Sequence, residues 1–432
     1  MAPTLTLSAK AGLQATLDEL ATSLPGCHVS IATTDGIIYQ ASSGQFDVLD
    51  TSATAQKASA DDVLWFASTT KLLTAVCYLS LIDKGVVAFD TPISDLYPPL
   101  KEASRQIYKG LDAEGKPIFE ANSTKITLGM MLNQTSGFGA EFQEKVMEWK
   151  TVTQKGKGFV NSCKVENLIH TPIVYEPGTQ YEYGNSAEWL GLILPELVHQ
   201  STESYLQENV CRPLKMGSTT FYPDNPAVAA RVMPLRWGEI SDSGAVEWQT
   251  LTDQLPLLTL PRKEKDIEYP VAGGGIFSNT TDYVTLLQYL LAHYLSLNDP
   301  SIVVPTKILS DASVASLFHR TLPDSAKDAM CEMFNGYIAV TGEWRVTRDE
   351  VDWSTGMCIY LPSDGRQREG WGRHGGSVGW GGAAGTEYWI DPKYGVACVF
   401  TTQMLPGNGP NIKDAKKVIE KAIYHAFESS KN

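Results

Sequence analysis

The chain has 432 residues, of which 35 are Lys or Arg and 49 are Asp or Glu, so its formal net charge is −14. An acidic surface repels phosphate backbones and anionic lipid headgroups, which argues against nucleic acid and membrane surfaces as partners. The length exceeds the roughly 250–300 residues at which a single core stops growing, so we expect one large unit over 1–432 that contains a distinct subregion.

The sequence shows no sign of a leader, a membrane segment or a metal site. Its start lacks a basic stretch followed by an apolar one, and no apolar run is long enough to cross a bilayer. The seven cysteines are scattered without C-x-x-C spacing, which is typical of reduced thiols. The seven histidines form no H-x-x-x-H or H-E-x-x-H pair. We therefore expect a cytoplasmic protein without a metal or other cofactor.

The first 85 residues predict a helix, a hairpin and a second helix. Apolar residues at helical spacing cover 8–24. The segment 28–42 (HVSIATTDGIIYQAS) predicts two strands around a turn at Thr34-Asp35-Gly36. An apolar stripe over 69–84, with Gly85 as its stop, predicts the second helix.

The middle of the chain, 86–270, alternates short helical patterns with loops marked by Pro and Gly, which predicts a mostly helical subregion. Loops between such elements often carry binding residues, so the poorly patterned stretches are expected to face a substrate. The expected helices cover 126–135, 186–199 and 202–211, and the expected loops cover 100–124, 139–160 and 221–270.

The last part of the chain predicts one helix, a run of strands and a final helix. A strong helical period covers 281–297, and a last amphipathic helix covers 412–428. Between them, from about residue 335, the strand-like segments are YIAV, GMCIYL, TEYWIDP and GVACVFTTQ. Tight turns between these segments indicate an antiparallel sheet.

The expected fold class is therefore α/β of the α+β type. Both chain ends, 1–85 and 271–432, are expected to build a central antiparallel sheet flanked by helices, and 86–270 forms the helical subregion.

Two serines are candidates for a nucleophile, and they imply different folds. Ser377 lies in HGGSVGWGG, which matches the G-x-S-x-G elbow of many serine hydrolases. An elbow needs a helix directly after the serine, whereas a glycine-rich stretch and a strand follow Ser377. His425 is the one histidine left downstream. We interpret the match as fortuitous, because a nucleophilic Ser377 would also require a parallel sheet.

Ser68 and Lys71 form an S-x-x-K pattern at the start of the second expected helix. Residues i and i+3 share a helix face, so the Lys71 amine can reach the Ser68 hydroxyl. A serine needs a base to become nucleophilic, and apolar neighbours such as Trp65, Phe66 and Leu72 favour the neutral amine. The helix N-terminus adds N–H groups where an oxyanion would form. Alone, the pattern also fits a capping serine followed by a surface lysine.

Tyr183 and Asn185 form a companion pattern in QYEYGNSAEWLG, just before another expected helix. A tyrosine can relay a proton between a nucleophile, a lysine and a leaving group. An asparagine can donate its amide to a substrate carbonyl or to the lysine. Alone, Y-x-N is equally typical of a packed tyrosine beside a helix cap.

Together, these segments resemble the serine β-lactamase-like superfamily, which includes class C β-lactamases, D-alanyl-D-alanine carboxypeptidases and family VIII carboxylesterases. The resemblance covers residues from about 10 to 428 and is nearest to the fungal lovastatin-type acyltransferases. It rests on the following segments in this order: FASTTKLLTAVCYLSLIDKGVVAFDTPISDLYP, MLNQTSGF, YGN, GGGIFSNTTDYVTLLQYL and a late glycine-rich strand with IDP.

The resemblance implies a role for each of the four residues above. Ser68 would be the acylated nucleophile and Lys71 its general base. Tyr183 would relay protons, and the Asn185 amide would orient the site.

The third family motif, Lys-Thr-Gly, is absent. Trp380-Gly381-Gly382 is expected in its place, so the Ala383 N–H would join the Ser68 N–H in an oxyanion hole. An alternative register places His374-Gly375-Gly376 there, with the Ser377 N–H as donor.

This departure bears on the expected substrate. Lys-Thr-Gly offers a cation and a hydroxyl to a substrate carboxylate, whereas Trp-Gly-Gly offers an apolar wall. The resemblance therefore implies a neutral acyl ester or thioester, with an acyl carrier protein as one candidate donor. It implies a serine esterase or acyltransferase that passes the acyl group to water or a small-molecule alcohol in natural-product metabolism. Two alternatives stay open: a β-lactamase or D,D-peptidase-type hydrolase, and a catalytically idle binding protein of the same fold.

Overall fold

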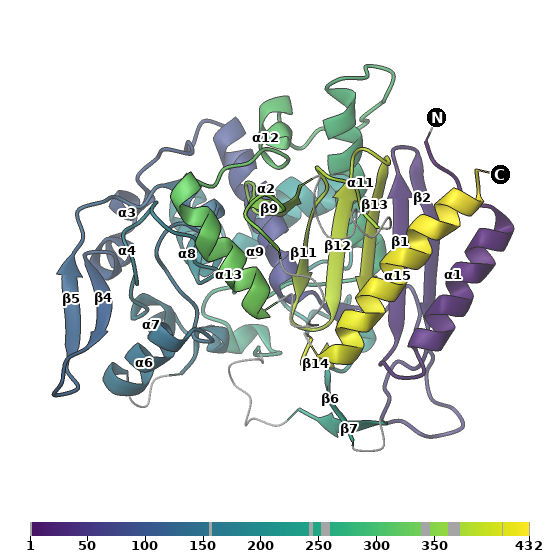
Figure 1. The fold of residues 1–432 in the computed structure, drawn as a ribbon, viewed down its shortest axis with the longest axis horizontal. Helices are drawn as coiled ribbons and strands as arrows, with labels where there is room; N and C mark the ends of the chain where they lie inside the picture. Colours follow the sequence, from purple (N-terminus) through teal and green to yellow (C-terminus); the bar gives the residue numbers. More distant parts are fainter. Residues whose placement is uncertain are drawn as a thin grey trace.

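Seven antiparallel strands form the main sheet, in the order β2-β1-β13-β12-β11-β10-β9 (Figure 1). The computed structural model describes residues 2–154, 158–241, 245–251, 260–337, 346–361, 372–407 and 409–431. The strands are β1 (Cys27–Thr33), β2 (Gly36–Ser43), β9 (Val351–Trp353), β10 (Cys358–Tyr360), β11 (Val378–Gly382), β12 (Thr386–Asp391) and β13 (Val396–Thr401). The expected antiparallel sheet from both chain ends is confirmed, with Val29 of β1 opposite Phe400 of β13.

Helices cover both faces of this sheet. The terminal helices α1 (Leu7–Leu20) and α15 (Pro410–Ser429) lie side by side on one face, as Figure 1 shows. Helix α11 (Thr280–Ser296) packs against β1 and β13 on the other face. Every residue of β1 and β13 is buried, as expected for a sheet between two layers.

The helical region lies beyond α11 and the sheet, and α2 (Thr70–Asp83) runs through its centre (Figure 1). The sequence predicts one apolar stripe for this helix, but every residue from Thr70 to Leu81 is buried, because other elements surround α2. The other helices are α3 (Ile93–Leu96), α4 (Pro98–Ala103), α5 (Leu128–Leu132), α6 (Glu144–Thr153), α7 (Val165–Ile169), α8 (Ser186–Val198), α9 (Thr202–Leu206), α10 (Arg212–Leu214), α12 (Asp311–Ser316) and α13 (Lys327–Tyr337).

The three stretches expected as loops contain regular structure. The stretch 100–124 holds a hairpin, 139–160 holds α6, and 221–270 holds a second hairpin. Four of the five residues of β5 are exposed, so the alternation that would indicate a strand is missing. The hairpins and the short remaining strands are β4 (Gln106–Leu111), β5 (Pro117–Ala121), β6 (Arg236–Ile240), β7 (Val246–Thr250), β3 (Leu64–Trp65), β8 (Phe277–Ser278) and β14 (Met404–Leu405).

One expected strand is not confirmed. The segment YIAV begins at Tyr337, which is the last residue of α13, and 338–340 lie outside the described residues.

His28 in β1 is expected to make the fold sensitive to acid. Its ring is 1% exposed, and burial lowers its pKa from 6.5 to about 4. Its Nε2 lies 3.8 Å from the Asp62 carboxylate, beyond hydrogen-bond distance. As the pH falls below 6.5, the unfolded chain takes up a proton here while the folded chain does not. The contribution of His28 to the free energy of unfolding should therefore fall by about 3 kcal/mol down to pH 4, measured by urea unfolding across this range.

A His28→Gln variant isolates this contribution. Glutamine does not titrate, so its free energy of unfolding should fall less steeply between pH 6.5 and 4 than that of the parent. Equal slopes would show that other groups cause the acid sensitivity.

Candidate active site

Ser68 lies in a tight 3₁₀ turn, Ala67–Thr69, that leads directly into α2. Ala67 has φ +48°, a left-handed conformation that costs a non-glycine residue roughly 1–3 kcal/mol. Side chains hold the turn: the Thr69 hydroxyl donates to the Phe66 carbonyl at 2.8 Å, and the Thr70 hydroxyl donates to the Ala67 carbonyl at 2.6 Å. The half-buried Ser68 is thus fixed at the N-terminal end of α2.

Lys71 is buried one residue inside α2, with 7% of its surface exposed. Its ammonium group donates to the Gly273 carbonyl at 2.7 Å and lies 4.5 Å from the centre of the Tyr183 ring. The neighbouring Thr74 hydroxyl donates to the Ala272 carbonyl at 2.6 Å. The glycine-rich segment after residue 270 therefore fixes Lys71, a contact that sequence reasoning missed although the segment GGGIF itself is conspicuous.

Tyr183 precedes α8 and joins Lys71 to the main sheet. Its hydroxyl accepts a hydrogen bond from Trp380 Nε1 at 2.9 Å. Its ring centre lies 5.1 Å from that of Trp380, 6.2 Å from that of Trp353 and 6.3 Å from that of Phe142. Aromatic rings therefore surround the tyrosine, and Trp353 and Phe142 are neighbours that the sequence did not indicate.

Asn185 lies at the N-terminal end of α8 but does not cap it through its side chain. It is 5% exposed, and its Nδ2 has no hydrogen-bond partner among the described residues. A buried amide without a partner costs free energy, so this donor is suited to a bound group.

The end of β11 lies against the Ser68 turn. A Cβ added at Gly382 would lie 2.5 Å from the Phe66 carbonyl oxygen and 3.2 Å from Ala67 Cβ. The Thr386 hydroxyl donates to the same Phe66 carbonyl at 3.0 Å. Ala383, which follows Gly382, is exposed. The structure thus brings Trp380, Gly381 and Gly382 to the site on one strand.

The alternative register lies at the other end of β11. The buried Ser377 hydroxyl donates to the His374 carbonyl at 2.5 Å, and His374 Nδ1 lies 2.9 Å from the Asp391 carboxylate. Burial would raise the pKa of Asp391, but hydrogen bonds from His374, Tyr394 and Tyr424 hold it below its usual value. The structure therefore packs residues 374–377 against α15 and does not bring them to Ser68.

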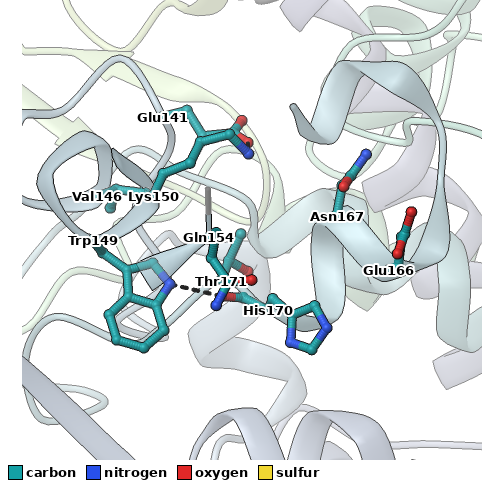
Figure 2. Close-up of a pocket in the computed structure, with 9 residues that line it drawn as sticks. All are labelled: Glu141, Val146, Trp149, Lys150, Gln154, Glu166, Asn167, His170 and Thr171. Carbon is teal, nitrogen blue, oxygen red and sulfur yellow. Dashed lines mark hydrogen bonds and ion pairs between the residues drawn. The ribbon is translucent and has the colours of Figure 1, made fainter. Parts of the chain in front are cut away.

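A separate pocket lies between α6 and α7 and contains none of the candidate residues (Figure 2). Lys150 pairs with Glu141 at 3.2 Å, and Trp149 Nε1 donates to the His170 carbonyl at 2.9 Å. Gln143, close to Glu141 in the chain, donates from Nε2 to the Tyr183 carbonyl at 3.0 Å. The N-terminal end of α6, next to the pocket, therefore contacts the backbone of Tyr183.

Within the described ranges, no three His, Cys, Asp or Glu side chains gather closely enough to hold a metal ion. A helix long and apolar enough to cross a membrane is likewise not found in that part of the chain.

Comparisons with known proteins identify relatives of the whole chain. An acyltransferase from Penicillium decumbens is 28% identical over 385 residues, which cover 85% of this chain and 82% of that protein. A lovastatin esterase from Penicillium rubens is 25% identical over 402 residues, with coverage of 91% and 92%. A solved variant of simvastatin synthase from Aspergillus terreus superposes with a TM-score of 0.79 at 24% identity, covering 98% of this chain and 95% of that one.

The family model described as beta-lactamase matches residues 13–423. This chain therefore belongs to the β-lactamase family and is an enzyme of the acyltransferase and esterase type within it.

Proposed function

We propose that the enzyme transfers an acyl group through an ester on Ser68. The observation that carries this proposal is the convergence of Lys71 and Tyr183, 4.5 Å from ammonium to ring centre, beside the turn that holds Ser68. Lys71 removes the hydroxyl proton as Ser68 Oγ attacks the acyl carbon. The bond to the leaving alcohol or thiol breaks, and Tyr183 passes the proton to that leaving group. An acceptor alcohol or water then attacks the ester, and the same groups work in reverse.

The negative charge on the acyl oxygen needs two donors. We assign these to the N–H groups of Ser68, at the start of α2, and Ala383, at the end of β11. The contact between Gly382 and the Phe66–Ala67 backbone supports this pairing. The unpartnered Asn185 amide is suited to orient the substrate carbonyl or the lysine.

The proposed substrate is a small, neutral acyl ester or thioester. Trp380 and its aromatic neighbour Trp353 offer apolar surface, and both indole N–H groups are already donated, to the Tyr183 hydroxyl and to the Leu132 carbonyl. Such surroundings favour an uncharged acyl group over the carboxylate of a β-lactam. Relatives named acyltransferase and lovastatin esterase fit natural-product esters, and an acyl carrier protein is the proposed thioester donor.

We propose that 1–432 works as one catalytic unit. Ser68 and Lys71 come from 1–85, Tyr183 from the helical subregion 86–270, and Trp380 from 271–432. The hydrogen bond from Trp380 to Tyr183 supports a single unit, because it joins 86–270 and 271–432 at the site. A cytoplasmic location is proposed from the seven cysteines, which are buried and form no disulfide bond.

Two acyl donors with one acyl chain test the proposal. A butanoyl p-nitrophenyl ester and a butanoyl thioester are turned over with rising concentrations of 1-hexanol as the acceptor, and ester and acid products are measured. A shared acyl-enzyme gives the same product ratio from both donors, and the ester fraction should rise with the alcohol.

Three results would contradict acyl transfer. If the free acid is the sole product, the enzyme hydrolyses the acyl-enzyme and is an esterase, not an acyltransferase. Hydrolysis of a chromogenic cephalosporin as fast as the esters would favour the β-lactamase alternative. No turnover, together with no labelling by a serine-reactive phosphonate, would favour a binding protein.

A further inference from the structure

A second buried charge lies close to Lys71. Glu188 is in the first turn of α8, one helical turn after Asn185, and is 7% exposed. A Cβ added at Gly273 would lie 2.1 Å from Glu188 Oε1 and 2.8 Å from Oε2, so the carboxylate rests directly on that glycine. Lys71 donates to the carbonyl of the same glycine at 2.7 Å. A carboxylate and an ammonium therefore meet at one residue.

The Glu188 carboxylate accepts a hydrogen bond from its own backbone N–H, which satisfies only part of its acceptor capacity. Its Oε2 is enclosed and has no partner among the described residues. Burying a carboxylate oxygen without a hydrogen-bond donor costs free energy of folding. Helix propensity does not explain the burial, because an exposed glutamate would stabilise α8 equally well. The compensation that the structure offers is the charge of Lys71.

The charged and titratable groups around Glu188 agree with this. Burial raises the pKa of Glu188, and the positive charge of Lys71 opposes that rise. Glu141 acts in the same direction as burial, but its own charge is met by Lys150 at 3.2 Å. The third neighbour is the buried Tyr269, whose pKa is raised mainly by burial and further by Glu188. Among the described residues, Lys71 is thus the one cation in the set of groups that act on Glu188.

We propose that Glu188 is a positioning residue for the general base: its buried carboxylate is the counter-charge that stabilises Lys71 while Lys71 carries the Ser68 proton. This rests on the proposed function, in which Lys71 is that base. Glycine at 273 is part of the arrangement, because any side chain there would displace the carboxylate.

The test is the pH profile of kcat/KM for acylation in Glu188→Gln, with rates corrected for active sites titrated by a phosphonate. Glutamine keeps the shape and removes the charge. The plateau at high pH should fall about ten-fold, a part of what a general base contributes. The part of the profile in which kcat/KM rises with pH, its acid limb, should move to lower pH. Removing the negative charge of Glu188 favours the neutral amine of Lys71. Glu188→Asp, which keeps the charge, should restore the parent limb.

Glu203→Gln is the matched control for a structural loss. This glutamate is also largely enclosed, but it accepts hydrogen bonds from the Thr220 hydroxyl at 2.8 Å and the Phe221 N–H at 2.9 Å, away from Lys71. Its replacement should lower the melting temperature and leave the profile unchanged.

A parent-like plateau and limb in Glu188→Gln would overturn the positioning role while acylation at Ser68 still stands. Failure of the parent enzyme to acylate Ser68 at all would overturn the proposed function instead.

Discussion

Ser68→Ala is expected to abolish covalent acylation and to lower turnover of p-nitrophenyl butanoate by about 10⁴-fold or more. In the proposed mechanism, Lys71 and Tyr183 then have no nucleophile to activate, and the two proposed oxyanion donors alone supply little rate. The measurement is mass mapping of the enzyme quenched during turnover. The butanoyl group should lie on the peptide that contains Ser68, and the variant should carry none.

Ser377→Ala is the matched control on the other serine. The Ser377 hydroxyl is buried and donates a hydrogen bond to the His374 carbonyl, so it cannot reach a substrate in this structure. Its loss should cost about 1 kcal/mol of stability and leave turnover within about two-fold. A butanoyl group on Ser377, or loss of labelling in Ser377→Ala alone, would contradict the roles proposed for both serines.

The parts of the fold that could be predicted are those with an apolar pattern or a clear turn signal in the sequence. Helices α1, α11 and α15 each keep one apolar face on the sheet, and the β1–β2 hairpin has a clear turn signal. The β4–β5 hairpin could not be predicted, because β5 is mostly exposed. Tertiary contacts, which a local pattern does not record, decide such elements.

The site shows the same limit. Ser68, Lys71, Tyr183 and Trp380 lie in motifs that the sequence displays, and the structure brings them together. Of the residues that hold them, Gln143 and Trp353 lie in no such motif, whereas Gly273 opens the GGGIF segment, whose contact with Lys71 the pattern does not show.

Those supporting residues are Gly273, Gln143 and Trp353. Gly273 is about 200 positions from Lys71, and Trp353 comes from a three-residue strand. Their function depends on distances across the fold. The G-x-S-x-G match at Ser377 is the converse case, since a local pattern is present but the surrounding hydrogen bonds enclose its serine.

Gly382→Ala is expected to lower kcat for acyl transfer by about 10²-fold. The added Cβ would lie 2.1 Å from the Thr386 hydroxyl oxygen and 2.5 Å from the Phe66 carbonyl oxygen. Thr386 can turn away, but Phe66 O belongs to the backbone of the Ser68 turn, so β11 and the turn must separate. A displacement of about 1 Å between reacting groups can cost this much. The measurement is the burst and steady-state release of p-nitrophenol per titrated active site.

Gly217→Ala separates this effect from the cost of any glycine replacement. A Cβ at Gly217 meets nothing within 4 Å, and the adjoining Ser218 N–H donates to Asp282 of α11 and not to the Ser68 turn, so kcat should not change. The loss in Gly382→Ala should fall on acylation and deacylation alike, because in the proposed mechanism both steps pass through an oxyanion held by the same pair of N–H groups. A loss confined to the melting temperature, with kcat per active site retained, would contradict the Ala383 N–H as a donor. The oxyanion would then have to be stabilised without the end of β11, and the contact between Gly382 and the Ser68 turn would serve stability alone.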